Sequence, residues 1–162
     1  MSINKIKFRS GVSLNDLQQV KEIVSSSGYF NNEEIDIALE LVEERLSKGE
    51  ASGYHFIFAD AEQTTVAYSC FGPIPATKYS YDLYWIAVHE SMRGQGIGKI
   101  LLKESERRIK DMGGQRIYIE TSGQEKYIST RKFYIRNGYQ EAAVLSDFYA
   151  PGDAKYIYVK EI

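Results

Sequence analysis

The segment from residue 81 to residue 122 restricts the possible folds more than any other part of the sequence. The run "YDLYWIAVHE" (81–90) is typical of a strand, and "GIGKILLKESERRIKDMGG" (96–114) has the apolar spacing of a helix. The run "QRIYIETS" (115–122) is again typical of a strand. A helical crossover joins strands that are parallel, so the sequence predicts a sheet containing a parallel pair.

The remaining elements can be placed by periodicity and by turn residues. Ser13 is the expected N-cap of the first helix, with Asp16 three residues on, and Asn31 or Asn32 is the expected N-cap of the second. The expected strands are 3–9, 54–60, 64–74, 139–148 and 154–161, and the expected helices are 13–28, 31–49 and 126–138. This order predicts an α/β fold with a mixed central sheet of about seven strands and helices on both faces. At 162 residues, the chain 1–162 is expected to form a single domain.

Composition excludes several classes of protein. The formal charge of −2 and the absence of Lys/Arg runs give no reason to expect nucleic-acid binding. Cys70 is the only cysteine, so no internal disulfide can form, and its apolar surroundings predict a buried thiol. With only His55 and His89 besides, no metal site is expected. No apolar run approaches the ~18 residues that span a bilayer, and "MSINKIKFRS" is no signal peptide, so we expect a cytoplasmic protein without membrane partners.

A glycine-rich turn stands where the central helix should begin. In "SMRGQGIGKILL" (91–102), Gly94, Gly96 and Gly98 occupy every second position. Glycine lets a backbone approach a ligand closely, and the first amides of a helix point outward at the positive end of its dipole. Arg93 adds a positive charge beside the turn. The three glycines are therefore expected to open the backbone around a phosphate group.

Two common phosphate loops do not fit these residues. A nucleoside-triphosphate loop needs G-x-x-x-x-G-K-[ST], but Arg93 replaces its first glycine and Ile100 replaces its hydroxyl residue. A dinucleotide-binding fingerprint needs G-x-G-x-x-G, but Lys99 stands where the third glycine belongs. The turn therefore serves another phosphate ligand.

The pattern Arg93-x-x-Gly96-x-Gly98 closely resembles the Q/R-x-x-G-x-G/A signature of the GNAT N-acetyltransferase superfamily. The stretch "LYWIAVHESMRGQGIGKILL" (83–102) resembles that family's central strand, loop and helix, and "RKFYIRNGY" (131–139) resembles its later helix. The resemblance implies that acetyl-CoA is the cosubstrate and that it lies where strand 83–89 splays from strand 116–121. Main-chain groups of Ile86, Ala87 and Val88 would then hold the pantetheine arm. The pyrophosphate would be wrapped by Arg93, Gly94, Gln95, Gly96, Ile97, Gly98 and Lys99.

The implied reaction is attack of a primary amine on the thioester, which calls for a base and an acid. Tyr134 occupies the tyrosine position of the family's F-Y-x-x-x-G motif and is the candidate acid, the alternative being that it packs the helix as Phe133 does. Glu120 is the favoured base or amine-binding group, and Asp82 is the next candidate. A structural hydrogen-bonding role for these carboxylates remains the third possibility. We interpret His89 as a loop residue.

The implied function is acetyl transfer from acetyl-CoA to an amine of a small molecule or a protein. Two alternatives stay open: use of another acyl-CoA donor, such as succinyl-CoA, and a non-catalytic acyl-CoA sensor. The tail "LSDFYAPGDAKYIYVKEI" (145–162) resembles bacterial GNAT proteins of undefined substrate. Its Asp147, Tyr149 and Asp153 would form either an acidic, aromatic rim over the acceptor site or an ordinary hairpin turn. Because dimers are common in the superfamily, a homodimer is a further expectation.

Overall fold

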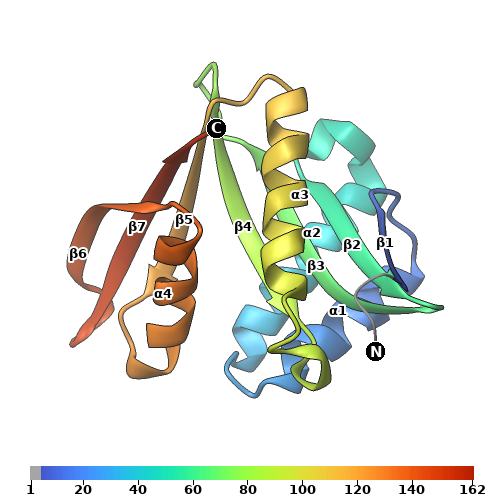
Figure 1. The fold of residues 1–162 in the computed structure, drawn as a ribbon, viewed down its shortest axis with the longest axis horizontal. Coiled ribbons are helices and arrows are strands. Elements are labelled where there is room, and N and C mark those ends of the chain that lie inside the picture. The colour runs from blue at the N-terminus through green and yellow to red at the C-terminus, as the bar shows by residue number, and fades with distance from the viewer. Residues whose placement is uncertain (1–4) are drawn as a thin grey trace. The chain divides into compact units, whose positions relative to one another are not determined.

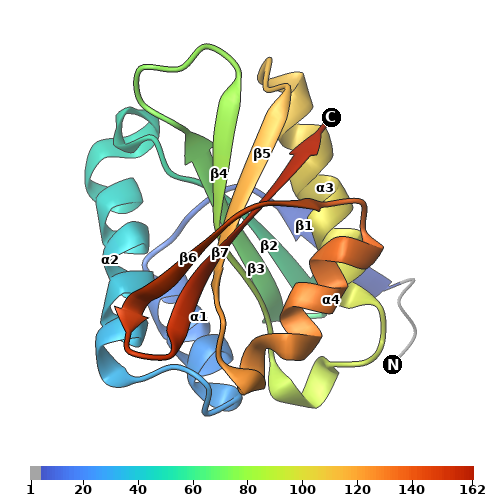
Figure 2. The same cartoon turned by 90° about the vertical axis from the view of Figure 1, so that its left-hand side faces the viewer.

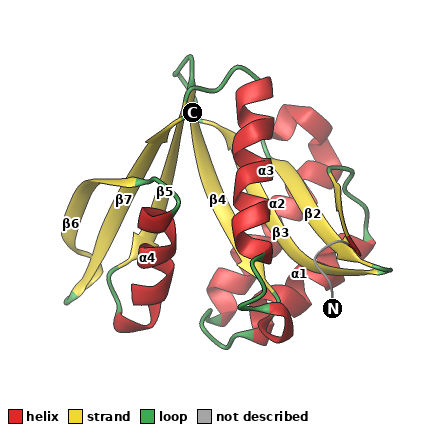
Figure 3. Ribbon diagram, in the orientation of Figure 1, coloured by secondary structure: helices red, strands yellow, loops and turns green. Residues whose placement is uncertain are grey.

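The computed structural model describes residues 5–162, and its helices and strands follow the predicted order (Figure 3). The α-helices are α1 (Asn15–Ser26), α2 (Asn32–Lys48), α3 (Ile97–Asp111) and α4 (Ile128–Arg136). Short 3-10 helices are η2 (Gly49–Ser52), η3 (Glu90–Met92) and η4 (Glu125–Tyr127). The strands are β1 (Ile6–Arg9), β2 (His55–Ala61), β3 (Thr64–Pro73), β4 (Ser80–Val88), β5 (Arg116–Ser122), β6 (Gln140–Ala150) and β7 (Asp153–Glu161).

The strands form one mixed sheet with the order β1-β2-β3-β4-β5-β7-β6. β4 and β5 are parallel, which confirms the prediction from residues 81–122, and the β1–β2, β2–β3, β5–β7 and β6–β7 pairs are antiparallel. The register of β4 with β5 runs from Ser80–Arg116 to Asp82–Tyr118, near the start of both strands. The predicted α/β fold with a mixed central sheet of seven strands is therefore confirmed.

The chain divides into two compact units whose segments alternate along the sequence. Unit 1 comprises Met1–Gly72 and Trp85–Arg108, and unit 2 comprises Pro73–Tyr84 and Ile109–Ile162. In unit 1, α1 and α2 cover one face of strands β1 to β3 and α3 covers the other (Figure 1). The α1–α2 face has a core built from Val20, Ile23, Val24, Ala38, Val42, Phe56, Phe58, Tyr68, Cys70 and Ala87. On the opposite face, Ser69 of β3 and Ser105 of α3 share a buried hydrogen bond of 2.7 Å between their hydroxyls.

Tyr68 carries a polar group that this apolar core does not satisfy. Its hydroxyl is buried and has no hydrogen-bond partner within residues 5–162, and burial raises the pKa of the phenol well above its usual value. An unpaired buried hydroxyl costs free energy. We therefore expect Tyr68→Phe to leave the free energy of unfolding unchanged or to raise it by about 1 kcal/mol, measured by urea denaturation.

Ser105→Ala is the matched control for Tyr68→Phe, because the Ser105 hydroxyl has partners. It bonds the Ser69 hydroxyl and donates to the carbonyl of Leu101 at 2.8 Å. Its removal leaves the Ser69 hydroxyl without its side-chain partner and is expected to cost about 1–2 kcal/mol. A Tyr68→Phe variant that loses as much stability as Ser105→Ala would contradict this account of the core.

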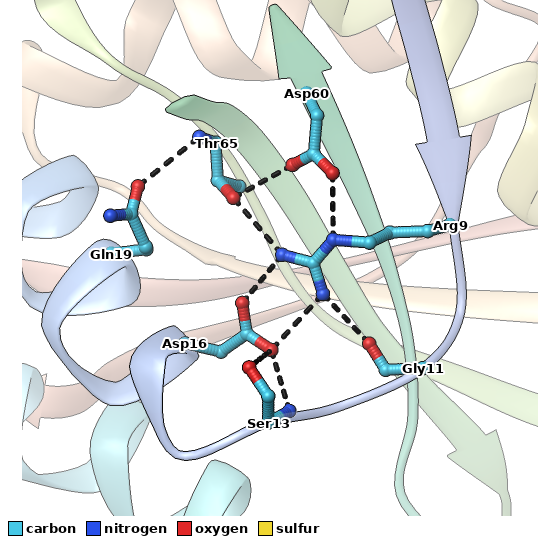
Figure 4. Close-up of polar contacts among 7 residues, drawn as sticks. All are labelled: Arg9, Gly11, Ser13, Asp16, Gln19, Asp60 and Thr65. Carbon is cyan, nitrogen blue, oxygen red and sulfur yellow. Dashed lines mark hydrogen bonds and ion pairs between the residues drawn. The ribbon is translucent and has the colours of Figure 1, made fainter. Parts of the chain in front are cut away.

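An ion-pair network centred on Arg9 joins β1, α1, β2 and β3 within unit 1 (Figure 4). Arg9 Nε donates to Asp60 at 2.7 Å, and Nη1 and Nη2 donate to the two oxygens of Asp16 at 3.1 and 2.6 Å. Nη1 also donates to the Gly11 carbonyl, and Nη2 donates to the Thr65 hydroxyl. These contacts engage all five N–H donors of a guanidinium.

The same network explains where α1 begins. Asp16 accepts hydrogen bonds from the backbone N–H and the hydroxyl of Ser13, at 2.7 and 3.1 Å. The helix starts at Asn15, and its N-cap position is Leu14, which makes no side-chain cap. The prediction of Ser13 as N-cap is therefore wrong, because its hydroxyl bonds the Asp16 carboxylate instead of a helix amide. For α2 the prediction is confirmed, since Asn31 forms a reciprocal capping box with Glu34.

In unit 2, helix α4 covers one face of strands β5, β7 and β6 and leaves the other face uncovered. α4 lies along one side of β5, β7 and β6 (Figure 2), and Tyr134 of α4 packs on Tyr158 of β7 with ring centroids 6.0 Å apart. Paired residues of neighbouring strands share a face, and successive residues alternate. The register therefore places one set on the side away from α4, and we call this set the Asp82 face: Asp82, Tyr118, Glu120, Lys155 and Ile157.

Candidate active site

The glycine turn follows directly from β4 in unit 1. The amide of His89 donates to the Val66 carbonyl of β3 at 2.8 Å, which fixes the end of β4. Gly94 and Gly96 then adopt left-handed conformations, with φ of +73° and +81°. Gly98 lies inside the first turn of α3, which begins at Ile97. Gly94 and Gly96 therefore bend the backbone before the helix, and Gly98 belongs to the first turn of α3.

A hydrogen bond, an ion pair and a cation–π contact hold this turn in place. The Glu90 amide donates to the Ser26 hydroxyl of α1 at 3.0 Å, and the Arg93 guanidinium lies 5.3 Å from the Tyr29 ring centroid. Arg93 also pairs with Glu90, at an N–O distance of 3.3 Å. The amide of Ile100 bonds the Gly96 carbonyl and closes the first turn of α3. The amides before it have no acceptor within the helix, so the turn suits an anion.

The structure also places the other predicted cofactor-binding residues in unit 1. Ala87 is buried in the core against α1 and α2. By strand alternation, the side chains of Ile86 and Val88 point to the opposite face. Gln95 makes a long contact from its amide nitrogen to the Met92 sulfur, 3.9 Å. His89 is a loop residue as predicted, and its Nδ1 bonds the Ser91 hydroxyl at 2.8 Å.

Tyr134 lies on the α4 side of unit 2. Only 6% of the residue is exposed, and its ring contacts those of Tyr139 and Tyr158 at centroid distances of 5.9 and 6.0 Å. Burial raises the pKa of its phenol, so the hydroxyl keeps its proton at neutral pH. Its neighbour Phe133 is only half-buried, so the two residues differ in their packing.

The two carboxylate candidates lie together on the Asp82 face, but only one of them is in an ion pair. Glu120 forms an ion pair of 2.6 Å with Lys155, and its side chain is 49% exposed. Asp82 forms no ion pair with any described residue. Burial and then the negative charge of Glu120 raise the pKa of Asp82, and the charge of Lys155 lowers it. The pKa of Asp82 is therefore raised above that of an ordinary aspartate, and this carboxylate has no cation paired with it.

Sequence reasoning missed Lys155. Its side chain is only 14% exposed, and its Nζ lies 2.6 Å from Glu120 and 4.3 Å from the ring centroid of Phe148. No short motif marks this lysine, because its partner Glu120 stands on another strand far away in the sequence. The β5–β7 register, which pairs Ser122 with Lys155, brings the two side chains together.

The two aspartates of the tail have hydrogen-bond partners within the protein. Asp147 accepts the Gly152 amide of the β6–β7 turn at 2.7 Å, as in an ordinary hairpin turn. Asp153 accepts the Ser122 hydroxyl and the Gln124 side-chain amide at 2.6 and 2.7 Å, which joins the start of β7 to the end of β5. The ring of Tyr149 packs against that of Phe148, with centroids 5.0 Å apart.

Cys70 is buried, and burial raises the pKa of its thiol. Among residues 5–162, no three His, Cys, Asp or Glu side chains come close enough to hold a metal ion. Within the same range, no helix is long and apolar enough to cross a membrane.

Known proteins share both the sequence pattern and the fold. A family model described as the acetyltransferase (GNAT) domain matches residues 52–141. A crystal structure from Desulfovibrio desulfuricans, of a protein assigned to the GNAT acetyltransferases, is 46% identical. It superposes with a TM-score of 0.95 over 96% of this chain and 98% of that chain. No curated protein matches the sequence.

Two less similar structures have the same fold. One is an aminoglycoside 6'-N-acetyltransferase complexed with coenzyme A, with 16% identity, a TM-score of 0.76 and 96% of each chain covered. The other is the ribosomal-protein-S18-alanine N-acetyltransferase of Escherichia coli, with 18% identity and a TM-score of 0.76. That match covers 97% of this chain and 94% of the other. With the family model covering more than half of the sequence, this chain belongs to the GNAT family of acetyltransferases.

Proposed function

We propose that this protein transfers an acetyl group from acetyl-CoA to a primary amine. The observation that carries the proposal is the left-handed Gly94–Gly96 turn between β4 and α3 in a chain of the GNAT family. Two solved proteins of this fold carry coenzyme A, the aminoglycoside acetyltransferase and the PaiA N-acetyltransferase of Thermoplasma acidophilum. The proposed ligand set comprises the main chain of residues 86–88 and of residues 93–99.

The groups present at the turn suit a diphosphate. Backbone amides at the start of α3 and the guanidinium of Arg93 supply hydrogen-bond donors and positive charge. A side-chain carbon built on Gly94 would meet no protein atom within 4 Å. The space beside this glycine is therefore open to a ligand.

The proposed acid and base lie on opposite faces of the unit 2 sheet. Tyr134 packs on the α4 side, against Tyr158, whereas Asp82 belongs to the face away from α4. The β4–β5 register pairs end at Asp82–Tyr118, although β5 continues to Ser122. Both candidate residues belong to unit 2, and we propose that the amine binds on the Asp82 face.

In the proposed reaction, the amine nitrogen attacks the thioester carbonyl and forms the new C–N bond. Asp82 takes the proton that the nitrogen loses, either directly or through water. The C–S bond then breaks, the electron pair stays on sulfur, and Tyr134 donates its proton to the departing thiolate. Asp82 replaces Glu120 as the proposed base because Lys155 already holds the Glu120 carboxylate.

A turnover assay tests the proposed function. Acetyl-CoA is supplied with a panel of monoamines, polyamines, aminoglycosides, amino acids and peptides, and release of the free thiol is measured. The expected result is thiol release that depends on an amine. Binding of coenzyme A without turnover on any amine would favour the sensor alternative, and faster turnover with succinyl-CoA would favour another donor.

The glycine turn can be tested separately with Gly94→Ala. This variant adds one methyl group where the ligand is proposed to lie, so we expect the KM for acetyl-CoA to rise about tenfold while kcat changes less. Gly53→Ala is the matched control, because Gly53 has a φ of +75° and equally open space. Both variants bear the ~1 kcal/mol strain of a left-handed alanine, but only Gly94→Ala should change the KM.

Two further properties belong to this proposal. We propose a cytoplasmic location, consistent with a single buried cysteine and no disulfide. A homodimer remains a prediction, and sedimentation of the purified chain measures it directly.

A further inference from the structure

Lys155 is the least expected charge on the Asp82 face. Lysine is almost never buried unless its ammonium is paired, yet only 14% of this side chain is exposed. Glu120 supplies the counter-charge at 2.6 Å, and the Phe148 ring lies 4.3 Å from the ammonium. The lysine is therefore held in place from two sides, by a carboxylate of β5 and by an aromatic ring of β6.

The charges of the Asp82 face can be counted from these contacts. Asp82 and Glu120 bring two negative charges, and Lys155 brings one positive charge, which leaves one negative charge. Farther along β5 on the same face, Arg116 pairs with Glu161 at 2.6 Å, so these two charges cancel. Among the described residues of the face, Asp82 is the one carboxylate without a cationic partner.

The surroundings of Asp82 are aromatic and aliphatic. Tyr118 pairs with it across the β4–β5 ladder, and Ile157 pairs with Glu120 on β7. Tyr118 and Ile157 are both half-buried, so part of each residue is exposed to solvent. Such a face offers contact to an apolar body and one counter-charge to an ammonium.

We infer that Lys155 is a specificity-determining residue, which neutralises Glu120 and so restricts the acceptor to amines carrying one positive charge on an apolar body. The inference rests on the proposed function and names its substrate class. A polyamine or an aminoglycoside would bring further ammonium groups to a face that has one negative charge to offer. Repulsion from the Lys155 ammonium then disfavours these acceptors.

The test compares kcat/KM for phenethylamine and for spermidine at saturating acetyl-CoA. Wild-type protein is expected to prefer phenethylamine. In Lys155→Met the ratio of the two values should fall about tenfold, since one repulsive charge is lost at a partly solvated site. Lys155→Arg keeps the charge and should keep the ratio. The matched control is Lys160→Met, a lysine of the same strand on the opposite face, whose Nζ donates to the Asn137 carbonyl.

Glu120→Gln provides a second variant that leaves Lys155 in place. The freed ammonium then lies near Asp82, so turnover of phenethylamine should fall about tenfold. Phenylalanine differs from phenethylamine by a carboxylate that an unpaired Lys155 can bind. Its kcat/KM relative to phenethylamine should therefore rise about tenfold. In the double variant Glu120→Gln/Lys155→Met, Asp82 remains alone, and phenethylamine turnover should return to within about threefold of wild type.

Two results would overturn the inference: a folded Lys155→Met protein with an unchanged substrate ratio, or a double variant as inactive as Glu120→Gln. The second result would make Glu120 itself the base. If wild-type protein acetylates no amine at all, the proposed function fails. The preference between the two amines can then still be tested by calorimetry, which measures binding of phenethylamine and of spermidine to wild type and to Lys155→Met. This test remains valid because the charges of the Asp82 face do not depend on turnover.

Discussion

Asp82→Asn is expected to lower kcat for amine acetylation by about 10² to 10⁴, the usual contribution of a general base. The asparagine keeps the size of the side chain but cannot accept the proton of the attacking amine. Binding of coenzyme A, measured by calorimetry, should stay within about twofold of wild type, because the proposed cofactor ligands are main-chain groups of residues 86–88 and 93–99, which the substitution leaves unchanged. Asp36→Asn, which changes an exposed carboxylate of α2, is the control and should keep full activity.

The same variant should be at least as stable as wild type. Burial and the charge of Glu120 raise the pKa of Asp82 in the folded protein above its unfolded value. A carboxyl of this kind binds its proton more tightly in the folded than in the unfolded protein. As pH rises from its unfolded pKa through its folded pKa, its ionisation therefore lowers the free energy of unfolding. At any pH above the folded-state pKa of Asp82 this cost is fully present, and Asp82→Asn removes it. A urea midpoint that falls at pH 7 would contradict this assignment, and at pH 3 the two proteins should differ little.

The pH profile gives a second readout of Asp82. If this carboxylate is the base, kcat/KM falls on the acidic side as it takes up a proton. The raised pKa places that limb above the ~3.9 of an ordinary aspartate. Glu120→Gln removes a charge that raises the pKa, so the limb should move to lower pH, and Lys155→Met should move it to higher pH. An acid limb that neither variant shifts would exclude Asp82 as the titrating group.

The largest loss of stability is expected from Asp16→Ala. The Asp16 side chain is fully buried and holds Arg9 through two oxygens, at 2.6 and 3.1 Å. Figure 4 shows the Arg9 guanidinium between Asp16 and Asp60. Truncation of Asp16 leaves the guanidinium bonded to Asp60 but without the carboxylate that holds it through two oxygens. Removing one partner of a fully buried ion pair costs about 3–5 kcal/mol, and because the Arg9 side chain is 35% exposed the loss should lie at the lower end of that range or below it. Urea denaturation followed by circular dichroism measures the change.

Variants of Arg9 and of a surface pair make this prediction specific. Arg9→Lys keeps the positive charge but loses the planar set of N–H donors. It should therefore lower the free energy of unfolding, but by less than Arg9→Met does. Glu44→Gln breaks the exposed Lys48–Glu44 pair of α2, also 2.6 Å long, and should cost under about 1 kcal/mol. If Asp16→Ala costs no more than Glu44→Gln, the Arg9 network does not hold β1 and α1 together.

Features that depend on neighbours in the sequence could be predicted from the sequence alone. The Asn31–Glu34 capping box, the left-handed Gly94 and Gly96, and the strand–helix–strand unit of residues 81–122 each arise within a few turns of chain. Local sterics and hydrogen bonds decide such features, so a pattern of residue types is sufficient to identify them. The misplaced N-cap at Ser13 shows the limit, since the distant Arg9–Asp60 contacts draw Asp16 into a network that no local rule describes.

The tertiary structure alone decided which charges meet. Glu120 and Asp82 were both predictable as candidate bases, but the Lys155 that separates their roles comes from β7, and only the strand register places it beside Glu120. Tyr134 was predictable as a candidate acid, and its position on the face opposite Asp82 became known only with the packing of α4 on Tyr158. Sequence patterns determine which elements form, because their energies are local. The pairing of ionisable groups depends on distances between strands that lie far apart along the chain, and those distances exist only in the folded protein.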